Sequence, residues 1–145
     1  MRKIIGTATV AGLVLSGGVL VSASADASPA PVRLQFTART LHEHGYGKTG
    51  YLATESDKQH GKLLGYDAVQ AKFDPATKTV DIHVALAIKG GTMLVDFNDV
   101  PEDQNPFFGT IVAGSGKFAG VTGTVRARDI GNTGNTRVTL TYTLP

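Results

Sequence analysis

Two adjacent side chains, Tyr66 and Asp67, lie in a largely apolar segment and are the best candidates for chemistry in this sequence. Neighbouring residues of a β-strand point to opposite faces of a sheet, so one of the two should face the interior. Burial raises the pKa of an interior aspartate and makes it a proton acceptor, whereas an interior tyrosine donates a hydrogen bond. We expect Tyr66 and Asp67 to be the catalytic residues. The alternative is a core tyrosine beside a surface aspartate.

A second pair, Asp81 and His83, is two residues apart and therefore shares one face of a predicted strand. An aspartate beside a histidine can form an oriented general base. The opposite face of the same segment carries five aliphatic side chains, which suit a core: Val80, Ile82, Val84, Leu86 and Ile88. We therefore expect the pair on the outer surface, where it serves solubility or a subunit contact.

A metal site is the third possibility, because His42, Glu43 and His44 are consecutive and His60 follows. The spacing does not match the helical histidine pairs of zinc enzymes, and the surrounding segment is polar and rich in glycine. A solvated loop is the favoured interpretation. The sequence predicts neither a metal site nor a cofactor.

The segments that must position these side chains alternate apolar and polar residues with a period of two, which is typical of half-buried strands. No segment after residue 31 has a helical period over three turns. The sequence therefore predicts an all-β domain of seven or eight strands, either an antiparallel barrel or a sandwich. We expect strands at 32–37, 51–54, 63–73, 79–89, 92–97, 108–112, 121–130 and 137–144, and loops at 42–50 and 100–106.

The first 27 residues have the organisation of a secretory signal peptide: a basic start, an apolar stretch and small residues before a cleavage site. Cleavage fits after Ala25 or Ala27, and glycines interrupt the apolar stretch, so a membrane anchor is disfavoured. We expect a secreted protein with a signal peptide at 1–27, a flexible lead-in at 28–32 and one domain at 33–145. The chain has no cysteine, so a packed core or a subunit interface must stabilise it.

The charge pattern gives no indication of a nucleic-acid partner. Without Arg2, Lys3 and Asp26, the formal net charge falls from +2 to +1, and lysine and arginine are scattered along the sequence. We expect no nucleic-acid binding and no stable membrane insertion.

The glycine-rich stretch from Gly109 to Val125 carries one aromatic residue, Phe118, among its glycines. Glycine within strand-like sequence marks a bend or a close approach of two backbones, so we expect Gly116 and Gly123 to be structural. The stretch resembles the Gly-Gly-Thr-Gly-x-Phe-x-x-x-x-Gly signature of the allene oxide cyclase and dirigent-like β-barrels. Two further segments, 64–92 and 137–142, are similar to actinomycete secreted dirigent-like proteins.

The resemblance implies a single eight-stranded antiparallel barrel, commonly a trimer, that binds an apolar small molecule in its lumen. It implies that the barrel steers cyclisation or coupling of that molecule stereochemically, either as an isomerase or cyclase or as a dirigent-type protein. We expect Phe36, Tyr66 and Tyr142 to line the lumen, with Asp67 supplying polarity, and the chain to form a homotrimer or homodimer. The alternative is a secreted binding or surface protein on the same barrel without a catalytic step.

Overall fold

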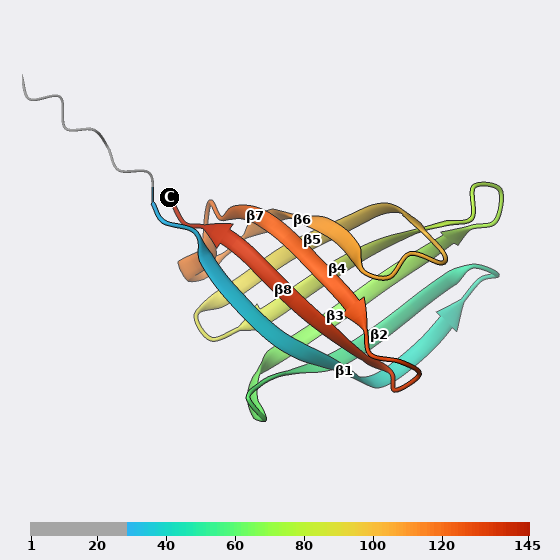
Figure 1. Cartoon of the computed structure of the whole chain (residues 1–145), viewed down its shortest axis with the longest axis horizontal. Coiled ribbons are helices and arrows are strands. Elements are labelled where there is room, and N and C mark those ends of the chain that lie inside the picture. Colours follow the sequence, from blue (N-terminus) through green and yellow to red (C-terminus); the bar gives the residue numbers. More distant parts are fainter. Residues whose placement is uncertain (1–28) are drawn as a thin grey trace, which may run out of the picture.

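The computed structural model describes residues 29–145, which form one closed sheet of eight antiparallel strands. Each strand pairs with the next along the chain, and β8 returns to pair with β1 (Figure 1). The elements are β1 (Val32–Tyr46), β2 (Gly50–Gln59), β3 (Lys62–Asp74), β4 (Thr79–Ile88), β5 (Gly91–Pro101), β6 (Phe107–Gly114), the 3₁₀ turn η1 (Gly116–Phe118), β7 (Thr122–Asp129) and β8 (Asn135–Thr143). The predicted all-β, eight-stranded antiparallel barrel is therefore confirmed. The predicted signal peptide, residues 1–27, lies outside the described residues.

The hairpin of β1 and β2 corrects the loop predicted at 42–50. β1 continues to Tyr46, and His44 pairs with Leu52 across the hairpin. The side chains of this part of β1 are polar and mostly exposed, so they lack the apolar alternation that marks a strand in sequence. The ladder is built by backbone groups, which pair whatever the side chains are. β5 likewise runs to Pro101, which shortens the loop predicted at 100–106.

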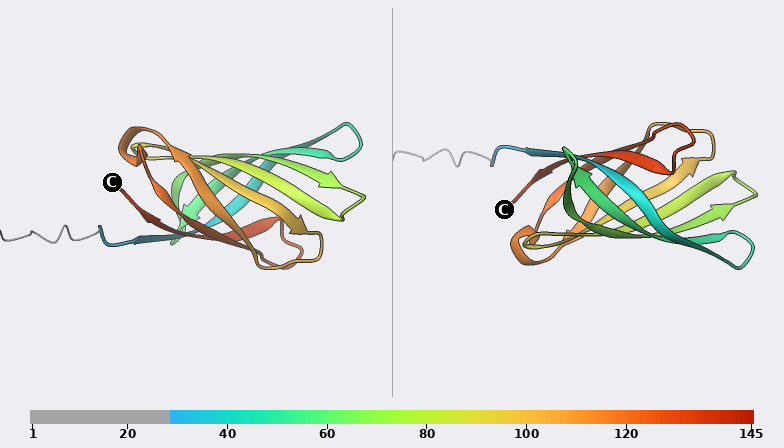
Figure 2. Two further views of the ribbon diagram at one scale, coloured as in Figure 1. Left: turned by 90° about the horizontal axis from the view of Figure 1, so that it is seen from above. Right: turned by 90° about the horizontal axis from the view of Figure 1, so that it is seen from below.

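One end of the barrel is closed by η1, which carries Phe118 into the interior, where only 1% of the residue is exposed. The Phe118 ring meets Tyr142 edge to face, with 6.1 Å between centroids. Met93 is fully buried in the same core. Figure 2 shows this end beside the C-terminus, while the 47–49, 75–78 and 130–134 turns lie at the other end. Among residues 29–145, no helix has the length and apolar character needed to cross a membrane.

Gly116 has a structural role, as its place in the glycine-rich stretch predicts. Its φ is +61°, a conformation that side chains disfavour. A Cβ at this position would also overlap the carbonyl oxygen of Gly90, which accepts a hydrogen bond from the Lys117 N–H at 2.9 Å. We expect Gly116→Val to lower the free energy of unfolding by about 2 kcal/mol or more, measured by urea denaturation.

Gly123→Val should be comparably destabilising for a different reason: a Cβ there would overlap the backbone of Thr141 in the paired strand. Gly131 is the matched control. The φ of Gly131 is +55°, positive like that of Gly116, but nothing lies within 4 Å of the position of its Cβ. Gly131→Val should therefore lower the free energy of unfolding by less than the other two substitutions. Unchanged stability in both the Gly116 and Gly123 variants would contradict the structural role.

Candidate functional site

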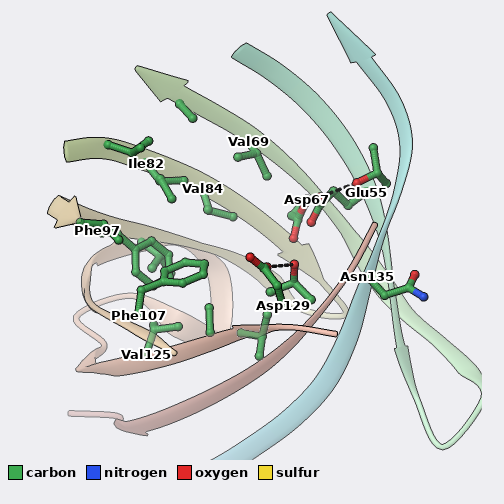
Figure 3. Close-up of a pocket in the computed structure, with 18 of the residues that line it drawn as sticks. Glu55, Asp67, Val69, Ile82, Val84, Phe97, Phe107, Val125, Asp129 and Asn135 are labelled. Atoms are coloured by element: carbon green, nitrogen blue, oxygen red, sulfur yellow. Dashed lines mark hydrogen bonds between the residues drawn. The ribbon is translucent and has the colours of Figure 1, made fainter. Parts of the chain in front are cut away.

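The barrel contains an apolar cavity of about 470 Å³ between its strands. That volume is in the range of small-molecule sites in proteins. Residues of the loops opposite η1, among them Glu102, Gln104 and Gly131, form its mouth, so the cavity opens at the end that η1 does not close. The wall is mainly aliphatic and aromatic (Figure 3), and includes Phe36, Val69, Ile82, Val84, Leu86, Val95, Phe97, Phe107, Val125, Val138 and Leu140.

Two carboxyl groups on strands β2 and β3 interrupt this apolar wall, and a third is buried beside them. Glu55 and Asp67 are directly opposite each other in the β2–β3 pairing, and both line the cavity. Asp57, two residues beyond Glu55 on the same face, lies nearer the closed end and is fully buried. Asp67 is 7% exposed. We call Glu55, Asp57 and Asp67 the carboxyl cluster (Glu55 and Asp67 are labelled in Figure 3).

The pKa values of the carboxyl cluster are all raised, and that of Asp67 lies above neutral pH. Burial, followed by the charge of Glu55, raises the pKa of Asp57 to about 7. Burial, followed by the charges of Asp57 and Glu55, raises the pKa of Asp67 to about 8. The pKa of Glu55 is also raised, mainly by burial. Like charges this close cannot all ionise in a low-dielectric wall, so the groups titrate together and share protons.

Few neighbouring groups satisfy these carboxyl oxygens. The Thr40 hydroxyl donates a hydrogen bond to Glu55 Oε1 at 3.0 Å. Both oxygens of Asp57 and Oδ1 of Asp67 are buried, and no residue of the described chain outside the cluster donates a hydrogen bond to them. Their hydrogen-bond partners are the other carboxyl groups of the cluster. No lysine, arginine or histidine of residues 29–145 lines the cavity. Two further acids, Glu102 and Asp129, lie at the mouth, and Asp129 accepts a hydrogen bond from the Thr136 hydroxyl at 3.0 Å.

The sequence-predicted site residues divide into three groups. Phe36 lines the cavity, as its place on the apolar face of its strand predicts, and Asp67 lines it too. Tyr142 faces inward but packs against Phe118 at the closed end, outside the cavity lining. Tyr66 lies on the outer face and is 52% exposed, which corrects the prediction that it lines the lumen. The reason is strand alternation: since Asp67 points inward, its neighbour Tyr66 points outward.

Glu55 and Asp57 are the site residues that sequence reasoning missed. The segment from Thr54 to Gln59 is entirely polar, so neither of its faces could be recognised as the core face. A usable signal existed in the spacing, because Ala53, Glu55 and Asp57 occupy every second position. That signal becomes informative only once the segment is known to be a strand opposite Asp67.

The other candidates lie outside the cavity. His83 is on the outer surface and pairs through Nδ1 with Asp96 at 2.8 Å rather than with Asp81. Asp81 instead accepts a hydrogen bond from the Asp99 N–H at 2.9 Å. His42 and His44 are exposed on β1. No group of three histidine, aspartate or glutamate side chains in residues 29–145 is arranged to hold a metal ion.

A closed eight-stranded antiparallel barrel, plugged at one end and hollow at the other, is the class of structure that these features define. No protein-family model matches the chain, and no curated protein matches it in sequence. Among solved structures, the barrel is similar to that of a pyocyanin demethylase, with a TM-score of 0.66 and 18% identity over 77% of this chain and 100% of that chain.

Two dirigent proteins with solved structures are also similar, both described as pterocarpan synthases. The first, GePTS1, has a TM-score of 0.61 and 14% identity, over 92% of this chain and 96% of that chain. The second, PsPTS1, has a TM-score of 0.54 and 15% identity, over 77% and 92% respectively. The resemblance to dirigent-like barrels is thus confirmed at the level of the fold.

Proposed function

We propose that this barrel binds an apolar small molecule in its cavity and that Asp67 transfers a proton to and from it. The observation that carries the proposal is a buried carboxyl cluster, with Glu55 and Asp67 on the wall of an apolar cavity of ligand size and with the pKa of Asp67 raised by burial. A cavity with a few convergent polar groups and a displaced pKa is typical of a binding or catalytic site. The similar structures are those of dirigent proteins and a demethylase, which supports small-molecule binding on this fold.

The chemistry that this geometry supports best is a stereochemically steered cyclisation. The apolar wall holds a reactive molecule in one folded conformation, so that its reacting atoms are close together. The neutral Asp67 carboxyl donates a proton to an oxygen of that molecule, a bond forms within the molecule, and a proton returns to the carboxylate. Atoms balance without a co-reactant, because product and substrate are isomers.

We also propose that the protein acts outside the cell, on the basis of the signal-peptide pattern at residues 1–27. Assembly as a homotrimer or homodimer is a further proposal. It is supported by apolar side chains exposed on the outer faces of β5 and β6, including Leu94, Phe108 and Val112. Exposed apolar side chains that lie near one another on a sheet are typical of subunit contacts.

Ligand binding is tested by filling the cavity. Ala71 lines the cavity and Ala68, on the same strand, faces outward, so the same substitution can be made on both faces. With the neutral fluorescent probe N-phenyl-1-naphthylamine, we expect Ala71→Trp to weaken binding at least tenfold and Ala68→Trp to leave it within about twofold. Equal binding by the wild type and both variants would place the probe outside the lumen and contradict the proposal.

The reaction is tested on whatever molecule the wild type retains from an extract of apolar metabolites, identified by native mass spectrometry. We expect Asp67→Asn to retain that molecule but to convert it to the cyclised isomer at least tenfold more slowly, because the wall is unchanged and the proton donor is lost. Retention without any conversion by the wild type would instead support the non-catalytic binding protein.

A further inference from the structure

All five arginines of residues 29–145 lie on the outer face of three consecutive strands. Arg126 and Arg128 are on β7, Arg137 is on β8, and Arg33 and Arg39 are on β1. All five are exposed, and the three strands lie side by side (Figure 1). Barrel closure therefore gathers on one face cations that are scattered in the sequence.

None of these arginines forms an ion pair with a residue of the described part of the chain. The ion pair found among residues 29–145, His83 with Asp96, lies on β4 and β5. Arg128 and Arg137 are directly opposite each other in the β7–β8 pairing. Like charges facing each other across strands destabilise a sheet, so the fold gains nothing from this arrangement. An anionic partner would remove the cost.

A hollow of about 530 Å³ next to the arginines adds further donors. It lies between β1 and the turn from β2 to β3, and Arg33, Lys58, His60 and Arg137 line it together with Gln35 and Thr37. Thr37 pairs with Arg137 on one side and with Lys58 on the other. Two cations and a hydroxyl from three adjacent strands can therefore surround one anionic group.

We propose that this arginine face, defined as Arg33, Arg126, Arg128, Arg137 and Lys58, binds a linear phosphate-bearing polymer. Guanidinium groups donate paired hydrogen bonds to phosphate oxygens, and the non-bridging oxygens of successive phosphate units can accept from donors on neighbouring strands. The face crosses four adjacent strands, β7, β8, β1 and β2, which suits a chain of charges better than one small anion.

A nucleic acid fits this face less well. Single strands are held by stacking their bases on aromatic rings. The outward positions of β7 and β8, and those of β1 from Arg33 to Arg39, are occupied by arginine, threonine and glutamine. The cations are present without the rings, so the favoured partner carries phosphate groups without bases.

The experiment uses inorganic polyphosphate as the probe, immobilised by one end, and measures binding by biolayer interferometry. We expect the triple variant Arg33→Gln, Arg126→Gln, Arg137→Gln to lose at least tenfold in affinity. The matched control removes three cations from elsewhere (Lys48→Gln, Lys72→Gln, Lys78→Gln) and should stay within about threefold. The affinity of the wild type should fall steeply as the salt concentration rises. In the variant with three arginines replaced by glutamine, the slope of log affinity against log salt concentration should be smaller.

Replacement of the same three arginines by lysine separates geometry from charge and keeps the proposal testable if the glutamine triple unfolds. We expect this variant to bind between the wild type and the glutamine triple. The proposal would be overturned if the Arg→Gln triple and the control triple at Lys48, Lys72 and Lys78 lost affinity equally. Net charge alone would then explain binding. Tighter binding of single-stranded DNA than of polyphosphate would also overturn it, in favour of a nucleic-acid partner.

Discussion

Replacing Asp57 with asparagine is expected to stabilise the barrel at pH 8 by several kcal/mol. The asparagine side chain has the same shape and carries no proton to lose. Asp57 is fully buried, and burial raises its pKa from an ordinary 3.8 to about 7. A tenfold change in an ionisation constant corresponds to about 1.4 kcal/mol, so a pKa raised this far costs on the order of 4 kcal/mol once the group ionises in the unfolded chain.

The direction of the pH dependence follows from the raised pKa values of Asp57 and Asp67. Below about pH 4, these groups hold their protons in both the folded and the unfolded chain. Between pH 4 and the folded-state values of about 7 and 8, the unfolded chain has lost protons that the folded chain keeps. The folded state binds more protons, so stability falls as pH rises through this window and levels off above it.

Urea denaturation between pH 4 and pH 9 measures this effect. We expect the wild type to lose several kcal/mol across the window, and Asp57→Asn to lose clearly less. Asp103→Asn, which removes an exposed loop carboxyl, is the control and should keep the slope of the wild type. A wild-type stability that rises from pH 5 to pH 8 would show that the carboxyl cluster is not protonated in the fold.

The barrel could be predicted from the sequence because its apolar strands are recognisable from their alternation of apolar and polar residues. In β4, the aliphatic positions alternate with polar or small ones over the whole strand, and the structure places the aliphatic face inward. The glycine-rich stretch also marked the position where η1 closes the barrel, since Gly116 adopts a positive φ and lies against Gly90. These patterns involve residues that are close together in the sequence, so they can be recognised without knowing which strands pair.

The candidate site depended on pairing between strands, which a single sequence does not contain. Asp67 was recognised because it interrupts an apolar strand, but Glu55 lies in a polar one and becomes notable only through its register with Asp67. The arginines show the same limit. Alternation places Arg126 and Arg128 on one face, yet only the register of β8 and the closure onto β1 bring Arg137 and Arg33 beside them.

The largest expected effect on binding concerns the charge of the ligand. Two probes share one anilinonaphthalene skeleton: N-phenyl-1-naphthylamine is neutral, and 8-anilino-1-naphthalenesulfonate carries a permanent negative charge. The cavity is lined by carboxyl groups, and no lysine, arginine or histidine of residues 29–145 lines it. Above about pH 8, where Asp57 and Asp67 ionise, the sulfonate should be repelled.

Two unit charges about 7 Å apart, at an effective dielectric constant of about 20, repel by about 2 kcal/mol, which is roughly 30-fold in affinity. We therefore expect fluorescence titrations to show the neutral probe preferred far more strongly at pH 9 than at pH 5. Asp67→Asn should reduce that change, because one of the charges that develop with pH is removed from the wall. In Ala71→Trp the cavity is filled, so the fluorescence that remains comes from probe bound at other sites. This background is subtracted for each probe. If the preference for the neutral probe over the sulfonate were the same at both pH values, the carboxyl cluster would not face the ligand. The proton transfer assigned to Asp67 would then be contradicted as well.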